Sequence, residues 1–318
     1  MISKVLFFLF LSMTSKAEKL NQRIYIDSLE TLTMTAGQFV NWDFEYEDDI
    51  TRQYPHHFHE MHEKPMHLII ISQDFASFSH VHPTLNPHAR RSFSIELNMP
   101  TDDPDNFQAQ QALQLSGKYF VFSEVMPMNY GMLMFPATVT AEGAPRNFDK
   151  LIPDSVNPDG SYAKFFDQNG QAVNPDQAYY KLQLKTEPLD LCNTIVPKFY
   201  LEFWAKDKDN WRPIQDLQTW LGAFAHAFII GSSGENAEDK VIQHLHSVWP
   251  IADDSNDSEE KGPFVEMAAH SHGLSTKDDI YAVWIQFKHN HKKQTRRFTI
   301  DWKLPPKGLI KKSCGVML

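Results

Sequence analysis

Apolar and aromatic residues occur along this chain in short runs of strand length, and only rarely at the three- and four-residue spacing of a helix. Turn residues bound most of these runs, and 19 prolines interrupt the chain. Short apolar runs between turns are typical of antiparallel β-sandwiches and argue against a βαβ sheet. We therefore expect an all-β protein, with strands at 39–44, 67–71, 119–122, 198–204, 227–230 and 281–287.

The runs of the second half of the chain resemble those of the first half, in the same order. Five pairs of segments match: 39–48 with 199–207, 66–70 with 225–229, 78–83 with 242–247, 117–122 with 279–284, and 134–139 with 297–302. Five matches in one order indicate an internal repeat. We expect two tandem β-sandwich units at 22–146 and 176–306. Between them, segment 147–175 is rich in Pro, Asn, Asp and Gly and is expected to be a linker; 307–318 is expected to be a tail.

Residues 1–17 have the pattern of a signal peptide. Lys4 precedes the apolar run 5–11, and Ser15 and Ala17 are small residues at the −3 and −1 positions of a cleavage site. A membrane anchor needs about 20 apolar residues, and this run ends by Met13. We expect a periplasmic or secreted protein that begins near Glu18, with no transmembrane segment in the mature chain.

Composition agrees with a folded, soluble product. The chain has 318 residues, of which 42% are hydrophobic and 22% charged, enough for two domains with their own cores. Its formal charge of −10 argues against nucleic acid binding. The two cysteines, Cys192 and Cys314, are far apart in sequence. In an oxidising compartment they can form a bridge, and two free thiols are the alternative.

Three histidines recur at matching positions of the two repeats. His67 precedes the pair His80 and His82 in the first unit, and His226 precedes His244 and His246 in the second. Residues two apart on a strand share a face, and cross-strand neighbours have Cβ atoms about 4.5–5.5 Å apart. A hairpin from His67 to His82 therefore brings three imidazoles together. Three imidazoles can hold one ion at about 2.0–2.1 Å, whereas a structural hydrogen-bond network is the alternative interpretation.

Copper or zinc is the expected ion. Imidazole suits copper, zinc, nickel and iron, and no cysteine adjoins the histidines, so a blue-copper centre is excluded. The first unit also contains the histidine-rich segment 56–62 and the methionine-rich segment 126–134. Thioether and imidazole together suit copper, but core filling is the expectation for the methionines. For segment 56–62 a solvated loop and a metal-capture segment are both open. The pairs His270/His272 and His289/His291 are expected at the surface.

Segments 66–75, 78–83 and 216–226 resemble exported bacterial β-sandwich proteins that carry one or two "M-H-L … H-x-H-P" units and occur in copper or heavy-metal settings. The resemblance covers both units, but not the linker or the tail. It implies an Ig-like or cupredoxin-like fold and periplasmic metal association, with the six histidines as ligands. The second unit departs from the pattern because Ser247 stands where the first has Pro83.

These features predict an exported protein that binds copper or zinc for storage, buffering or delivery, with an exported or membrane-bound metal-handling partner. A metal-free adhesion module is one alternative. A three-histidine metal enzyme is another, with Asp74 or Glu124 as general base. The chain lacks the G-x-S-x-G and H-E-x-x-H motifs.

Overall fold

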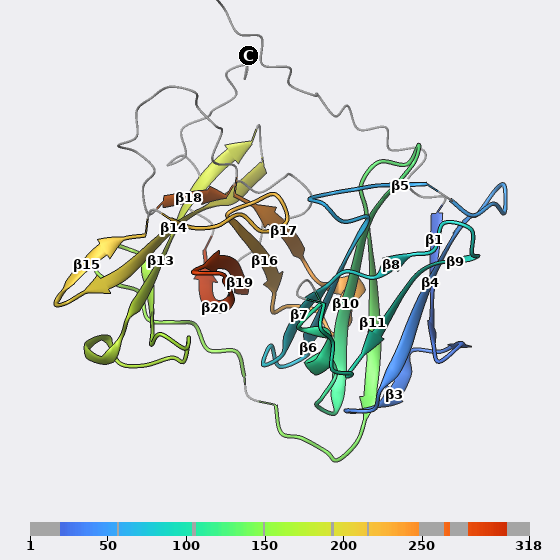
Figure 1. Ribbon diagram of the computed structural model, residues 1–318, viewed down its shortest axis with the longest axis horizontal. Coiled ribbons are helices and arrows are strands. Elements are labelled where there is room, and N and C mark those ends of the chain that lie inside the picture. Colours follow the sequence, from blue (N-terminus) through green and yellow to red (C-terminus); the bar gives the residue numbers. More distant parts are fainter. Residues whose placement is uncertain are drawn as a thin grey trace, which may run out of the picture. The chain divides into compact units, whose positions relative to one another are not determined.

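The computed structural model describes residues 20–55, 57–103, 106–148, 150–191, 194–214, 216–247, 264–267 and 279–303. These residues form an all-β protein, and the described part contains no α-helix (Figure 1). The described residues divide into two compact units near residue 149, and of those after it 236–238 are grouped with the first unit. The predicted fold class is confirmed. Segment 147–175 was wrongly predicted to be a linker, since it contains a strand of the second unit.

Unit 1 contains two sheets. Its strands are β1 (Leu20–Ile26), β2 (Leu29–Glu30), β3 (Thr33–Thr35), β4 (Val40–Asp48), β5 (Phe58–His59), β6 (Met66–Ser72), β7 (Phe78–Val81), β8 (Thr84–Leu85), β9 (Arg91–Leu97), β10 (Gly117–Pro127) and β11 (Leu133–Glu142), with the 3₁₀ turn η2 (Ala109–Gln111). The strand orders are β2-β1-β4-β9-β8 and β3-β11-β10-β6-β7, with β5 on β10. All pairs are antiparallel except β3 with β11, which is parallel.

Unit 2 is also built from two sheets. Its strands are β12 (Tyr162–Phe166), β13 (Tyr180–Leu191), β14 (Thr194–Asp207), β15 (Asn210–Pro213), β16 (Ala225–Gly231), β17 (Ile242–His246), β18 (Phe264–Met267), β19 (Asp279–His289) and β20 (Lys292–Trp302); two 3₁₀ turns are η3 (Pro175–Gln177) and η4 (Ala237–Asp239). The orders are β12-β13-β14-β15, with β18 on β14, and β17-β16-β19-β20.

Each unit has its own core between its sheets. In unit 1, Trp42 and Phe44 of β4 belong to one buried cluster with Leu68 and Ile70 of β6. In unit 2, the corresponding cluster joins strands β13 and β14 to β16, β19 and β20. Alternate residues of a strand face opposite sides, so Leu68 and Ile70 point into the core while His67 and Ile69 point to the other face of the sheet. The histidines therefore lie outside the sandwich cores.

The two histidine-bearing sheets share a strand order. β7-β6-β10-β11 in unit 1 corresponds to β17-β16-β19-β20 in unit 2. Tyr119 pairs with Val139, and the matching Tyr281 pairs with Ile300. Val139 therefore corresponds to Ile300, so the predicted match of 134–139 with 297–302 is wrong by two residues. The internal repeat that relates the two units stays a prediction.

Candidate metal centre

A tight turn before β6 fixes the ring of His67. His62 and Glu63 both have positive φ, and Met61 and Lys64 form a two-hydrogen-bond bridge around them. The Met61 carbonyl is thereby held beneath the second residue of β6. It accepts a hydrogen bond of 2.7 Å from Nε2 of His67. Because a carbonyl can only accept, Nε2 carries the proton and Nδ1 of the neutral ring is left with its lone pair.

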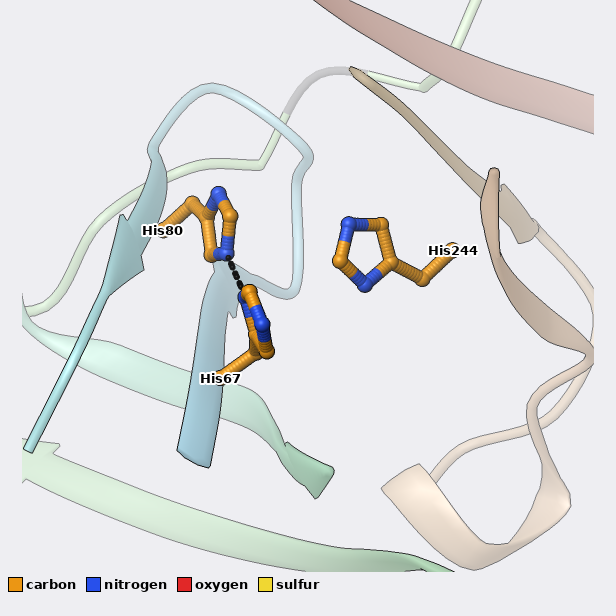
Figure 2. Close-up of side chains that lie close together, drawn as sticks. All are labelled: His67, His80 and His244. Carbon is orange, nitrogen blue, oxygen red and sulfur yellow. Dashed lines mark hydrogen bonds between the residues drawn. The ribbon is translucent and has the colours of Figure 1, made fainter. Parts of the chain in front are cut away.

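His80, the first histidine of the H-x-H pair, lies beside this lone pair. Nε2 of His80 is 2.9 Å from Nδ1 of His67, and a dashed line marks this contact in Figure 2. The ring of His82 is centred 5.0 Å from that of His67 and 4.6 Å from that of His80. Two nitrogens bound to one ion at about 2.0–2.1 Å lie about 3 Å apart. The spacing between His67 and His80 therefore suits a shared proton, and equally a shared ion once His80 carries its proton on Nδ1.

The pairing of β6 with β7 sets this arrangement. Ile69 pairs with His80 and Leu68 pairs with Val81. Continued by one residue, this register puts His67 opposite His82. Val81 points into the core of unit 1. The prediction that His80 and His82 share a face with His67 is confirmed by this register.

Two side-chain amides hold the outer edge of the histidine hairpin. The backbone N–H of His80 donates to Oε1 of Gln108 at 2.9 Å, and that of His82 donates to Oδ1 of Asn106 at 2.6 Å. Nδ2 of Asn106 also donates to the His82 carbonyl. These amides pair with backbone groups of the hairpin edge that a neighbouring strand would otherwise bind. The paired edge is therefore less able to associate with another chain. Sequence reasoning missed both residues, although their spacing of two matches that of the histidines.

Unit 2 repeats the anchoring device with different residues. Leu221 and Gly222 have positive φ, and Trp220 and Ala223 form the bridge around them. The Trp220 carbonyl accepts a hydrogen bond of 2.8 Å from Nε2 of His226. In both units the acceptor is six residues before the histidine, so His226 also presents Nδ1.

The second histidine hairpin has the register of the first. His226 pairs with His246, and Phe228 pairs with His244, which is labelled in Figure 2. The rings of Phe228 and His244 stack with centroids 4.1 Å apart. One donor atom from each of the three histidines lies within 4.8 Å of the others. Nitrogens bound to one ion at about 2.0–2.1 Å lie about 3 Å apart, so these side chains would have to move closer together to hold one ion.

Burial keeps the anchored histidine of unit 1 neutral. His67 and His80 are fully buried, and His82 is 4% exposed. Burial lowers the pKa of His67 to about 4, because the charged ring cannot be solvated there. Neutral imidazole is the form that binds metal. His67 is therefore ready to act as a ligand at neutral pH.

The neighbouring strand places an ionisable group beside His67. Glu124 of β10 pairs directly with His67, so the two side chains share a face. Burial raises the pKa of Glu124 to about 7. The corresponding residue of unit 2 is Gln286, which pairs with His226. The two candidate centres thus differ by one carboxylate.

Ser247 performs a structural task of its own. Its Oγ accepts hydrogen bonds from the backbone N–H groups of Phe224 and Ala225, at 2.9 and 3.3 Å. These bonds tie the end of β17 to the start of β16. The departure from Pro83 therefore leaves the histidine register of unit 2 intact.

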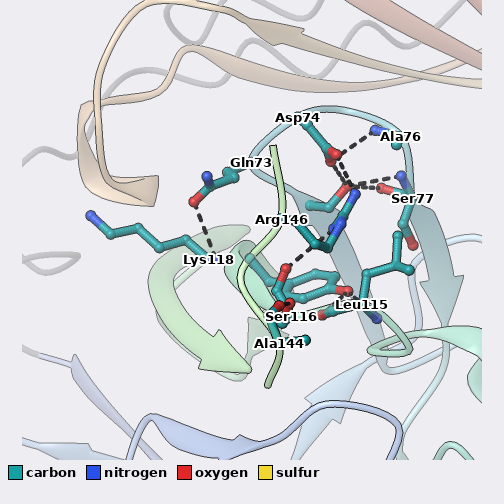
Figure 3. A network of polar contacts seen from close by, with 11 residues as sticks. Gln73, Asp74, Ala76, Ser77, Leu115, Ser116, Lys118, Ala144 and Arg146 are labelled. Carbon is teal, nitrogen blue, oxygen red and sulfur yellow. Dashed lines mark hydrogen bonds and ion pairs between the residues drawn. The ribbon is translucent and has the colours of Figure 1, made fainter. Parts of the chain in front are cut away.

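Asp74 does not share the position of Glu124. Figure 3 shows it in a network with Arg146, whose Nη2 is 2.6 Å from Oδ2, and with the backbone N–H of Ala76. Ser72 donates a further hydrogen bond. Burial acts to raise the pKa of Asp74, but the hydrogen bonds from Ser72 and Ala76 and the charge of Arg146 outweigh it and lower the pKa. Asp74 stabilises a loop and is a weak candidate for a general base.

The remaining histidines and methionines are placed differently from expectation in two cases. His289 is buried, with Nδ1 near the Tyr180 hydroxyl and Nε2 3.2 Å from Asp216. It ends β19, and Asn290 and His291 form the positive-φ turn to β20, so the pair is no strand H-x-H motif. Met128 and Met132 are 43% and 49% exposed and do not fill the core.

Several predicted features lie outside the described residues. They are the signal peptide 1–17, His56, His270, His272, both cysteines and the tail 307–318. His57, His59 and His62 of the histidine-rich segment are exposed. No helix in the described ranges is long and apolar enough to cross a membrane.

Residues 194–303 match the model of a family described as a domain of unknown function (DUF8832). This segment holds the three histidines of the unit 2 centre and covers less than half of the chain. A search of curated proteins found no match. Arguments about function therefore rest on the two histidine clusters themselves.

Proposed function

We propose that this protein binds copper or zinc at two centres, His67/His80/His82 in unit 1 and His226/His244/His246 in unit 2, for metal storage, buffering or delivery. The observation that carries the proposal is the shared anchor. In each unit a backbone carbonyl six residues upstream accepts the Nε2 proton of the strand histidine. A histidine whose far nitrogen is bound to a carbonyl is a typical metal ligand, with its tautomer and ring orientation fixed in advance.

The hydrogen-bond alternative explains these contacts less well. A purely structural network requires only that buried nitrogens find partners, whereas here each unit directs a lone pair toward an H-x-H pair in the same register. The surrounding residues differ widely between the units, including the turn residues that supply the carbonyl. Retention of the three imidazoles among different neighbours supports a role for the imidazoles as a set.

Titration with copper and with zinc tests the proposal. The chain from residue 18 onward is expected to bind one ion per unit, and the His80→Ala/His82→Ala variant is expected to lose one of the two. His57→Ala/His59→Ala, which alters exposed histidines of the same unit, is the matched control for zinc. Equal zinc stoichiometry in the parent and the His80/His82 variant, with both folded, would leave those histidines as structural residues.

Binding should depend on pH. Protons compete with the ion for imidazole, so affinity should fall as pH drops through about 6.5, the ordinary histidine pKa. His67 itself resists protonation because its pKa is lowered to about 4. Acid release should therefore continue below pH 6.

We also propose that the protein is exported and acts in the periplasm or outside the cell, beside an exported or membrane-bound metal-handling partner. The support is the segment 1–17, with its single basic residue before the apolar run and small residues at 15 and 17. Mass spectrometry of the exported protein should find a chain that begins near Glu18. An intact Met1 on exported protein would contradict this.

A further inference from the structure

The end of β10 lies beside a histidine-bearing strand that belongs to neither three-histidine centre. β5 pairs antiparallel with β10, with His59 opposite Met126 and Phe58 opposite Pro127. The backbone N–H of Met128 donates to the His57 carbonyl at 2.9 Å, which extends the same pairing by one step. Two histidine–methionine pairs therefore follow each other along this edge.

Both pairs lie on the same face. Phe58 packs against the core of unit 1, with its ring 4.7 Å from Phe93 and 5.7 Å from Tyr46. Side chains alternate along a strand, so His57 and His59 point away from that core. Residues directly opposite on antiparallel strands share a face, with Cβ atoms about 4.5–5.5 Å apart. Met126 and Met128 therefore accompany the two histidines.

This surface is open to solvent. His57 and His59 are exposed, Met128 is 43% exposed, and Met126 is partly buried. Packing in the core does not account for two methionines at such positions. A thioether is a soft ligand that selects Cu(I), whereas zinc sites use imidazole, thiolate and carboxylate ligands.

We propose that His57, His59, Met126 and Met128 form a second, solvent-exposed metal site in unit 1 that is selective for Cu(I). Two imidazoles and two thioethers supply an uncharged, soft donor set for a monovalent ion. The site shares no residue with the three-histidine centres, so it can be tested independently of the proposed function.

Unit 2 lacks this donor set at the corresponding place. There Gln218 forms the bridge to Lys288, with its backbone N–H 2.9 Å from the Lys288 carbonyl. Lys288 stands two residues after Gln286, as Met126 stands two after Glu124. An amide and an ammonium group at this position offer no soft ligand, and the ammonium repels a cation. Both units therefore have this backbone pairing, but unit 2 has no methionine at the position of Met126.

Anaerobic Cu(I) titration against a colorimetric chelator tests the site. The parent for the test is the chain from residue 18 with Cys192→Ser and Cys314→Ser, which removes thiol ligands. Met126→Leu/Met128→Leu is expected to lose one equivalent of Cu(I) while its zinc stoichiometry stays unchanged. Met132→Leu changes an exposed methionine outside the two pairs and should keep every equivalent.

Two results would overturn the proposal. One is equal Cu(I) stoichiometry and affinity in the parent and the Met126/Met128 variant. The other is X-ray absorption of the His80→Ala/His82→Ala variant of the parent, loaded with Cu(I), that shows no sulfur ligand on copper. This second measurement does not depend on whether the leucine variant folds, and it distinguishes this site from the unit 1 histidine centre.

Discussion

Units 1 and 2 carry three histidines in the same strand register and surround them with different chemistry. Across the sheet of unit 1, Met134 pairs with Glu124 and Glu124 with His67. Across the sheet of unit 2, Thr295 pairs with Gln286 and Gln286 with His226. The strand register and the turn carbonyl, which position the histidines, are the same in both units. The residue beside the anchored histidine, which sets the local charge, differs: it is Glu124 in unit 1 and Gln286 in unit 2.

The charge difference has a direct chemical meaning. An ionised Glu124 brings one negative charge to a centre of three neutral imidazoles, whereas Gln286 brings none. A carboxylate favours a divalent ion, because the attraction grows with the ion's charge and is weakly screened in a buried site. On the proposed function, unit 1 should prefer Zn²⁺ or Cu²⁺ more strongly than unit 2 does.

The largest expected effect concerns the metal-free protein. The folded-state pKa of Glu124 is about 7, above its ordinary value of 4.5. Below pH 4.5 the carboxyl group is protonated in both the folded and the unfolded state, so its ionisation costs no stability there; stability is lost as pH rises from 4.5 through about 7. At pH 8, Glu124→Gln should increase the free energy of unfolding of unit 1 by up to about 3 kcal/mol.

Hydrogen exchange of the amides of β6 and β10 measures this change in unit 1 alone. At pH 4 the gain should vanish. His67 contributes the opposite pH dependence between about 4 and 6.5, and comparing the parent with Glu124→Gln at each pH cancels it. A gain that is the same at pH 4 and pH 8 would show that Glu124 is not an ionised, buried group at pH 8.

Exchanging the two residues should exchange the metal preferences. Glu124→Gln is expected to weaken zinc binding in unit 1 about 10- to 100-fold, the range typical of groups that support a metal site. Gln286→Glu should strengthen zinc binding in unit 2. Calorimetric titration of both variants measures the shifts. Unchanged affinities in both would place the two side chains outside the influence of the ion.

Much of this arrangement could be predicted from the sequence. Strand runs and the H-x-H spacing were sufficient for the all-β class and for the shared face of His67, His80 and His82. The anchoring carbonyls could not be predicted, because Met61 and Trp220 act through their backbones and their side chains give no signal. Asn106 and Gln108 come from a segment distant in sequence from the hairpin, and no local sequence pattern predicts their contact with it.

Two other predictions were wrong although the sequence contained evidence against them. His289 was expected at the surface, but Asn290 and His291 form a two-residue turn, for which asparagine is a favoured residue. The apolar run before it should have placed His289 at the end of a strand. Segment 147–175 was taken for a linker on its turn residues, although Tyr162–Phe166 contains the aromatic residues of a strand.

A smaller effect is expected from the groups that hold each hairpin. Asn106→Ala removes the acceptor for the His82 backbone N–H and should destabilise unit 1 by about 1–2 kcal/mol. Ser247→Ala removes the acceptor for two backbone N–H groups of unit 2 and should cost about 1 kcal/mol. Chemical denaturation followed by hydrogen exchange resolves the two units. An effect of either variant on the other unit would show that the hairpins are not held independently.

The most direct test of the account is to locate the imidazole protons by two-bond ¹H–¹⁵N NMR, without and with zinc. Without metal, His67 and His226 should both carry their proton on Nε2, as the carbonyls of Met61 and Trp220 require. Zinc should then shift the Nδ1 resonances of both residues and leave the Nε2 protons in place. A proton on Nδ1 in the metal-free protein, or Nδ1 resonances that do not respond to zinc, would contradict the assignment of these histidines as metal ligands.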